Sequence, residues 1–327
     1  MTFLFRPARW PVFSGTTAGH RVAAENAARS VAAAAGSARG VAAAARGHDV
    51  SVSESSESGY RHGDGLTRPP VEPEPDLEDA FDRLVDEGSG RLARPWSTLV
   101  VTGLLGGIDV GTGVLAYLLV KEASGSAILA GLAFSIGFVA LVLARSELFT
   151  ENFLVPVAAV AARHGSVGGL ARLWAVSLVA NLAGGWGIAW LIMQAFPRLY
   201  PTAVESGTHF ADLGMNLHSF SLAVLAGMVI TLMTRMQHAT DSLGVRLVPA
   251  VLFGALLAGG QLFHSVLDSI LMFAALITGR APFGYLDWLA ALGWAILGNL
   301  VGGIGLVTFL RLARVPHRLA EERGRHG

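Results

Sequence analysis

From about residue 95 onward, apolar residues fill long runs that are separated by short polar or glycine-containing loops. Each run approaches the length of about 20 residues that a helix needs to cross a bilayer. Six transmembrane helices are predicted, near residues 97–120, 127–148, 171–195, 218–237, 248–277 and 287–312. The pattern therefore predicts an all-α membrane protein.

Two of these runs contain polar residues in places that a continuous membrane helix does not favour. The second run ends in SELFTENF, Ser146–Phe153, before apolar residues resume, and the fifth holds Gly259, Gly260, Gln261 and His264 near its middle. Irregular backbone persists at membrane depth only where it is buried in protein or lines a wet cavity, because lipid offers no hydrogen-bond partners. We therefore expect helices 2 and 5 to be broken and their breaks to meet around a pathway.

Two short sequences recur in the same order in both halves of the apolar region. ELFT at 147–150 is similar to QLFH at 261–264, and NLAGGWG at 181–187 is similar to NLVGGIG at 299–305. Because each half holds three predicted spans, a second copy would be upside down, which predicts an inverted three-plus-three repeat. The glycines would let the third and sixth spans pack closely against neighbouring backbones.

The remaining parts of the chain differ in composition from the apolar runs. Residues 1–75 are rich in Ala, Ser, Gly, Pro and charged residues, which predicts a disordered cytoplasmic extension. Residues 76–94 carry apolar side chains at helical spacing, which predicts an amphipathic interfacial helix followed by a linker. A six-helix domain over 95–312 and a cytoplasmic tail over 313–327 complete the predicted order.

Charge and composition narrow the function classes. Only 15% of the residues are charged, whereas soluble domains average about 25%. Acidic and basic residues balance at 24 each, so nothing indicates a nucleic-acid partner, and the lack of cysteine excludes disulfides and thiolate chemistry. Arginines gather on one side, before the first span, in the loops after spans 2 and 4, and after the sixth span. The positive-inside rule then predicts that both termini are cytoplasmic.

Three stretches carry a family resemblance: GLAFSIGFVALVLARSELFTENFL at 131–154, LFHSVLDSIL at 262–271 and GNLVGGIGLV at 298–307. In this order they resemble the formate/nitrite transporter family of bacterial membrane channels, over roughly residues 76–312. The resemblance implies an aquaporin-like fold in the bacterial inner membrane and a homopentamer with a pore in each protomer. It implies passage of small monovalent weak-acid anions such as formate or nitrite, with no enzymatic activity, cofactor or metal.

The resemblance also implies which residues lie on the pathway. In the family, two hydrophobic constrictions flank a chamber that contains a threonine from the second-helix break and a histidine from the fifth, which match Thr150 and His264. The constriction positions match Leu148, Phe149, Phe134, Phe138 and Leu257. A histidine proton, or protonation of the anion, would lower the cost of crossing an apolar slit, so passage is passive or proton-coupled. Capping by Thr150 and simple packing of His264 are the structural alternatives.

Acidic and basic residues near the breaks form a candidate charge network. Glu147 and Glu151 lie four residues apart and would share one helical face, so we expect Arg145 or a backbone donor to compensate one of them. Asp109 lies midway along the first predicted span, where an ionisable residue indicates function. We expect Asp109 to pair with an arginine such as Arg145 or to be protonated.

Asp268 completes this candidate network. His264 and Asp268 form an H-x-x-x-D pair, but two ligands without a third are weak evidence, so no metal site is predicted. Glu151, Arg145 and Asp268 all differ from the residues that are common in the family at the matching positions. These differences, and the lack of a family lysine before the fourth span, bear on the substrate more than on the fold.

Two other functions compete with an anion channel. A neutral-solute channel on the same fold is one, although no Asn-Pro-Ala pair of the aquaporin type occurs in the chain. The other is a membrane-embedded hydrolase that would use His264, Asp268 and Glu147, for which the sequence shows no nucleophile motif. A structural or regulatory membrane protein that has lost transport also remains open.

Overall fold

A computed structural model describes residues 75–325 of the chain. The predicted N-terminal extension, residues 1–75, lies outside the described residues except for Pro75. Every regular element of the described part is helical. In chain order these are α2 (Pro75–Leu92), α3 (Trp96–Ser124), α4 (Ala127–Ala144), η1 (Phe149–Phe153), α5 (Val155–Ala161), α6 (Val167–Ala195), η2 (Pro197–Leu199), α7 (Tyr200–Asp212), α8 (Leu217–Gln237), α9 (Leu243–Gly259), α10 (Ser265–Ile277), α11 (Tyr285–Leu300), η3 (Val301–Thr308), α12 (Phe309–Leu312) and α13 (Pro316–Arg325).

Within the described residues, five helices are long and apolar enough to cross a membrane: α3, α4, α6, α8 and the continuous run Tyr285–Leu312. The predicted fifth span, 248–277, is not one helix, because α9 ends at Gly259 and α10 begins at Ser265. The predicted second span also stops early, at Ala144, and the chain resumes as η1 and α5. Several apolar helices of this length are typical of a multi-pass helical membrane protein.

Both breaks begin in the same way. Arg145 and Gln261 have φ angles of 54° and 50°, in the left-handed region that ends helices. The following amides turn back, so that Ser146 N–H donates to the carbonyl of Leu141 at 3.2 Å and Leu262 N–H donates to that of Leu257 at 3.1 Å. Neither left-handed residue is a glycine, so the surrounding structure must hold both conformations against a steric penalty.

Glycines allow two pairs of helices to cross at backbone contact. A Cβ atom at Gly184 of α6 would overlap the carbonyl of Leu104 on α3, and one at Gly302 of η3 would overlap the carbonyl of Val224 on α8. The third glycine of each NLxGGxG sequence, Gly187 or Gly305, has open space around it. The prediction that these glycines serve close packing is confirmed for Gly184 and Gly302.

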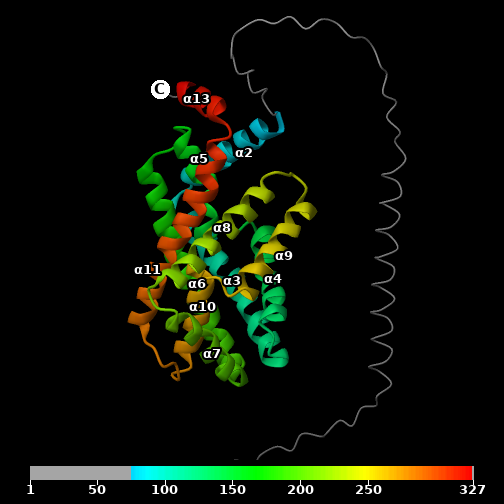
Figure 1. Ribbon diagram of the computed structural model, residues 1–327, viewed down its shortest axis with the longest axis vertical. Helices are drawn as coiled ribbons and strands as arrows, with labels where there is room; N and C mark the ends of the chain where they lie inside the picture. The colour runs from blue at the N-terminus through cyan, green and yellow to red at the C-terminus, as the bar shows by residue number, and fades with distance from the viewer. Residues whose placement is uncertain (1–74, 326–327) are drawn as a thin grey trace, which may run out of the picture. The chain divides into compact units, whose positions relative to one another are not determined.

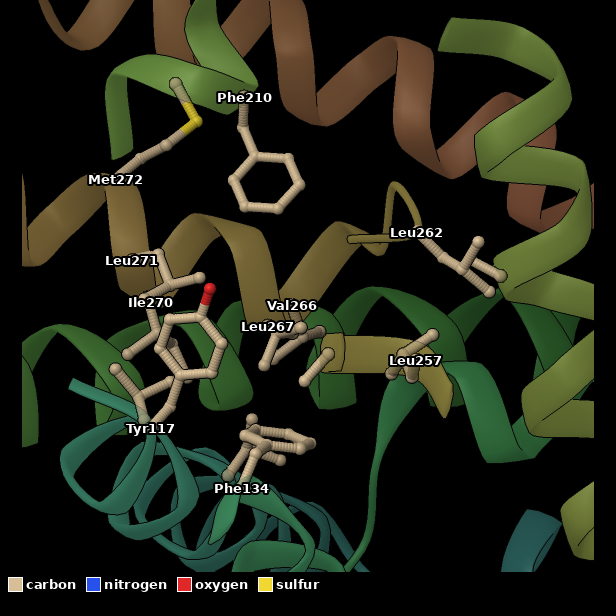
Figure 2. Packing of buried hydrophobic residues seen from close by; sticks show 14 of the residues in the cluster. Tyr117, Phe134, Phe210, Leu257, Leu262, Val266, Leu267, Ile270, Leu271 and Met272 are labelled. Carbon is tan, nitrogen blue, oxygen red and sulfur yellow. The ribbon is translucent and has the colours of Figure 1, made fainter. Parts of the chain in front are cut away.

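The buried core surrounds α10, whose residues from Ser265 to Ala275 are all buried. Figure 2 shows Phe134 of α4 and Leu257 of α9 near Val266 and Leu267 of α10, and all four belong to one apolar cluster. Large apolar side chains also cover outer faces, and α4 alone exposes Ile128, Leu129, Leu132 and Ile136. Such faces are favourable against lipid, where apolar groups need no shielding from water.

The first and last described helices lie at one end of the helical domain, and α7 lies at the other (Figure 1). The apolar residues of α2 are buried within the protein: Leu84 packs with Leu154, Val155 and Ala158, and Phe81 and Val85 pack with Ala162 and Val315. Arg318 of α13 donates to both carboxylate oxygens of Asp82 at 2.9 and 2.7 Å. The amphipathic helix predicted at 76–94 therefore uses its apolar face against α5 and the segment before α13.

Candidate functional site

One asparagine holds the first break in place. The side-chain amide of Asn181 donates to the carbonyls of Gly103 and Glu147 at 2.7 and 2.8 Å, and its oxygen accepts from Phe149 N–H at 2.8 Å. Asn181 is fully buried. It thus supplies the hydrogen bonds that the interrupted helix no longer makes for itself.

Asn299 does the same for the second break. Its amide donates to the carbonyls of Ala223 and Phe263 at 2.8 and 2.9 Å, and its oxygen accepts from Ser265 N–H at 3.0 Å. We call Asn181 and Asn299 the two asparagine clamps. They are the first residues of the two NLxGGxG sequences. The repeated asparagine could therefore have indicated the clamps, whereas a role was predicted only for the glycines.

The clamps fix which positions of the two breaks are equivalent. Glu147 and Phe263 offer matching carbonyls, and Phe149 and Ser265 offer matching N–H groups. The left-handed residues, Arg145 and Gln261, follow the same pairing. The ELFT and QLFH sequences are therefore displaced from the structural register, and Thr150 and His264 do not occupy equivalent positions.

Thr150 and His264 are nevertheless in direct contact. Thr150 Oγ1 and His264 Nε2 are 2.9 Å apart, and both side chains are fully buried. Thr150 comes from η1 and His264 is the residue before α10, so the contact joins the two breaks. The two residues that sequence comparison placed on one pathway thus lie together.

The neighbours of His264 determine its neutral tautomer. His264 Nδ1 accepts from Leu267 N–H at 3.1 Å, which caps α10. A neutral imidazole that accepts at Nδ1 carries its proton on Nε2, so Nε2 donates to the Thr150 oxygen. The hydroxyl hydrogen of Thr150 then points elsewhere and is available to another acceptor.

Asp268 supports the backbone of His264 and does not contact its ring. Asp268 Oδ2 accepts from His264 N–H at 2.7 Å, while its buried Oδ1 has no hydrogen-bond partner among the described residues. The H-x-x-x-D pair therefore contributes to the start of α10. An acid near the first turn of a helix is favourable there.

The apolar residues predicted for the pathway belong to the same core cluster. Phe134 and Phe138 meet edge to face with ring centroids 5.2 Å apart, and Phe149 meets Phe153 in the same way at 5.1 Å. Leu148 and Leu257 are fully buried in this cluster. The cluster surrounds the breaks with apolar material.

Glu147 takes three partners, and Arg145 is not one of them. Arg94 Nη1 donates to Oε2 at 2.8 Å, Asn152 Nδ2 donates to Oε1 at 3.0 Å, and the Thr102 hydroxyl lies 3.4 Å from Oε2. The expectation that Arg145 or a backbone donor compensates this carboxylate is wrong for Glu147. Arg94, in the linker before α3, does so.

A second ion-paired group joins α2 to the end of α8. Glu87 accepts from Arg91 at 2.6 Å and lies 2.8 Å from His238 Nε2, while His238 Nδ1 lies 2.7 Å from the carbonyl of Thr234. Both ring nitrogens of His238 therefore lie within hydrogen-bond distance of an oxygen. Burial would raise the pKa of Glu87, but His238 and Arg91 hold it well below its usual range. Burial would lower the pKa of Arg91, but Glu87 and Glu147 raise it above its usual value.

A cavity of about 550 Å³ lies between these groups. Its polar and charged lining consists of Glu87, Arg91, Arg94, Arg145, Ser146, Glu147, Glu151, Thr234, Gln237, His238, Asp241 and Arg246. We call this cavity the charged pocket. Glu151 is only 5% exposed and, within the described residues, its side chain forms no hydrogen bond or ion pair.

The hypothesised pair between Asp109 and Arg145 does not form. In the described part of the chain, Asp109 takes no ion pair and its Oδ2 is buried without a hydrogen-bond partner. Arg145 lies at the left-handed end of α4, is exposed, and lines the charged pocket. The position of Arg145 after the last helical residue directs it toward the pocket, whereas Asp109 lies mid-helix on α3.

Comparison with known proteins places this arrangement in a family. The family profile described as "Formate/nitrite transporter" matches residues 78–313, which is more than half of the chain. The chain belongs to the formate/nitrite transporter family.

Three members or neighbours illustrate the similarity. The inner membrane protein YfdC of Escherichia coli is 26% identical over 254 residues, covering 74% of this chain and 80% of its own length. The formate channel FocA of Haemophilus influenzae is 26% identical over 243 residues, covering 64% and 84%. A solved pentameric formate channel with formate bound matches the fold with a TM-score of 0.57 at 21% identity, covering 67% of this chain and 97% of that one.

In this chain the apolar cluster and the charged pocket meet at the first break. The Thr150–His264 contact is enclosed by apolar residues, while Glu151, the next residue, lines the charged pocket. The boundary between the two environments thus falls between adjacent residues.

Proposed function

We propose that the protein is a channel for small monovalent weak-acid anions such as formate or nitrite. The contact between Thr150 and His264 carries the proposal, because it brings a hydroxyl and an imidazole together where two interrupted helices meet. Membership of the formate/nitrite transporter family supports it. So does the similarity to the formate channel FocA.

The central pair can bind an anion by donation. The Nε2–H group of His264 donates a hydrogen bond to the Thr150 oxygen. The hydroxyl hydrogen of Thr150 is then free to donate to a carboxylate or nitrite oxygen. The positive N-terminal end of α10 adds to this preference for negative charge. Transport then requires no covalent bond to form.

We assign the constrictions to the apolar residues around the pair: Leu148, Phe149, Phe134, Phe138 and Leu257. An ionised formate would lose its hydration there at a cost of several kcal/mol, and a donated or transferred proton reduces that cost. We expect these constrictions to exclude ions of similar size that cannot be protonated, because such ions must keep their hydration.

The finer architecture follows from the matched breaks. We infer six membrane spans in an inverted three-plus-three repeat, with α4–η1–α5 and α9–α10 as the two broken helices. The two asparagine clamps and the two left-handed residues support this assignment. The pentameric formate channel of similar fold supports a homopentamer with one pore per protomer.

We place the protein in the bacterial inner membrane with both termini cytoplasmic. The E. coli relative bears the description of an inner membrane protein. The arginine distribution supports the orientation. The domain order then runs from an N-terminal extension (1–75), through the α2 region (76–94) and the channel domain (95–312), to a cytoplasmic tail (313–327).

A hydrolase fits the contacts less well than a channel. Glu147 is held by Arg94 and Asn152, whereas His264 contacts Thr150, so the acids and the histidine do not form one catalytic group. The relatives with a functional name are a channel and a transporter.

Flux measurements on purified protein in proteoliposomes test the proposal. We expect formate and nitrite fluxes above those of empty vesicles, in a series that also includes lactate and hydrosulfide. Absence of any anion-dependent flux would contradict it. The His264→Phe variant should lose flux yet assemble like the natural protein, since the aromatic ring fills the site without donating a proton.

A further inference from the structure

The charged groups of the charged pocket satisfy one another, with Glu151 as the exception among the buried carboxylates. The Glu147 side chain has three hydrogen-bond partners, and Glu87 is bonded to Arg91 and His238. Asp241, at the exposed rim, lies 3.8 Å from Arg246. Glu151 is only 5% exposed, and its carboxyl group has no hydrogen-bond donor or cation bonded to it within the described residues.

The surroundings of Glu151 carry both signs of charge. From α2 it faces Arg91 and Glu87, from the break Glu147, and from the end of α8 His238. Arg91 and His238 are already bonded to Glu87. The other charged lining residues are Arg94, Arg145, Asp241 and Arg246. A buried carboxylate without its own donor is costly, so this environment favours a carboxyl group that keeps its proton.

An amide of the same pocket is also unsatisfied. Gln237 Nε2 is buried and has no hydrogen-bond partner among the described residues, and Gln237 lines the charged pocket together with Glu151. The pocket therefore contains an unused donor and an unused carboxyl group. A small anion that enters can accept from both, provided that Glu151 is protonated.

His264 cannot supply a proton without losing a structural bond. Its Nδ1 must stay unprotonated to accept from Leu267 N–H, and its single proton on Nε2 is donated to Thr150. Protonating Nδ1 would place its N–H group against the N–H group of Leu267 at the start of α10, so that two donors would face each other. These hydrogen bonds therefore favour a group other than His264 as the proton donor to the anion.

We infer that Glu151 is this proton donor, and that it transfers its proton to the anion at the inner end of the charged pocket. The O–H bond of the Glu151 carboxyl breaks as an O–H bond forms on the anion oxygen, giving the neutral weak acid and the Glu151 carboxylate. The neutral acid proceeds past Thr150 and His264. Water in the pocket then returns one proton to Glu151, so that one proton accompanies each anion. This inference rests on the proposed anion transport.

The position of Glu151 suits this step. It is adjacent in sequence to Thr150, which contacts His264, and it also lines a cavity whose rim includes the exposed Arg145 and Asp241. Glu151 can therefore exchange protons with the pocket and reach an anion before it enters the apolar surroundings. In its ionised form it would repel an anion that arrives without a proton.

Simultaneous measurement of formate and proton movement in proteoliposomes tests the inference. We expect the natural protein to move one proton with each formate, after subtraction of empty-vesicle rates. Glu151→Gln should reduce formate uptake driven by a proton gradient at least about tenfold. Leaving the anion charged adds more than the ~1.4 kcal/mol of barrier that a tenfold change in rate represents. Asp241→Asn, at the rim of the same pocket, should keep the natural proton-to-formate ratio.

The outcomes separate the two proposals. Formate flux with no accompanying proton, or an unchanged ratio and rate in Glu151→Gln, overturns the role of Glu151 and leaves the anion channel intact. Absence of formate flux in the natural protein overturns both. If Glu151→Gln does not assemble, formate flux without a proton in the natural protein still overturns the role of Glu151, and Glu151→Asp, which retains a protonatable carboxyl group, should preserve the natural rate and ratio.

Discussion

The two helix breaks share a scaffold but differ in their surroundings. Each begins at a left-handed residue and is held by an asparagine clamp with three hydrogen bonds. The first break continues as the short helix η1 and borders the charged pocket, whereas the second leads directly into α10, which is buried along most of its length. The backbone support is thus nearly symmetric, while the chemistry is not.

This difference indicates how two similarly supported breaks can give a channel a direction. The clamps need only the backbone at each break, so the side chains there are free to diverge. In this protein the first break carries Glu147 and Glu151, whereas the second carries His264 and Asp268. An anion that crosses therefore meets the ionisable groups in a fixed order.

Replacing the clamps should give the largest effect. Asn181→Leu or Asn299→Leu removes three hydrogen bonds and leaves buried backbone groups unpaired, which we expect to cost on the order of 3 kcal/mol or more in each case. Thermal stability of the purified protein in detergent measures this. Similar losses for the two variants would support equivalent clamps, whereas tolerance of one substitution would show that the two breaks are held differently.

The glycine contacts should give the next largest effect. Gly184→Ala and Gly302→Ala push a methyl group into the carbonyls of Leu104 and Val224, which we expect to cost about 1–3 kcal/mol each. Gly187→Ala and Gly305→Ala are matched controls, because a Cβ atom there meets open space. The same thermal assay should therefore separate the two pairs. Equal behaviour of tested and control glycines would contradict close packing as the reason for the motif.

Removing the contact between Thr150 and His264 should reduce formate flux more than it reduces thermal stability. Thr150→Val keeps the shape of the side chain but removes the hydroxyl that accepts from His264 and donates to an anion. We expect formate flux to fall about tenfold, equivalent to about 1.4 kcal/mol of barrier. Thr150→Ser, which keeps the hydroxyl, is the control. Full flux in Thr150→Val would remove the hydroxyl from the pathway.

The smallest expected effect concerns the attachment of α2 beside the first break. Because the pKa of Glu87 is lowered in the folded protein, its contribution to stability is complete above the usual carboxyl pKa of about 4 and is lost as pH falls through the lowered value. Hydrogen exchange of the α2 amides should accelerate over that acidic range. Glu87→Gln should remove this pH dependence, and an identical profile in the variant would contradict the role of Glu87.

Sequence patterns predicted the features that depend on local chain chemistry. The polar residues in the second and fifth apolar runs located both breaks, and the glycines located the close crossings. Membership of the formate/nitrite transporter family was also predictable, because the motifs are long and ordered. Thr150 and His264 could be paired only through the family resemblance.

Partner choice was harder to predict, because it depends on packing between distant segments. Arg145 was expected to neutralise Glu147 or Asp109, but its left-handed conformation at the end of α4 places it on the pocket, and Arg94 reaches Glu147 instead. The register of the two breaks was also predicted wrongly. The similarity of ELFT and QLFH aligned Glu147 with Gln261, whereas the backbone hydrogen bonds make Glu147 equivalent to Phe263. The clamp hydrogen bonds and the two left-handed residues reveal the equivalent positions.

The contacts between α2 and the C-terminal segment also constrain how the protein is made. Phe81 and Val85 pack with Val315, and Asp82 binds Arg318, so the earliest described helix depends on residues that the ribosome adds near the end. The contacts of α2 with α5 and with the end of α8 can form earlier, but those with Val315 and Arg318 must follow synthesis of the last membrane span. Attachment of α2 is therefore completed late in biogenesis, and a chain cut short before Val315 would keep its spans but lack these two attachments.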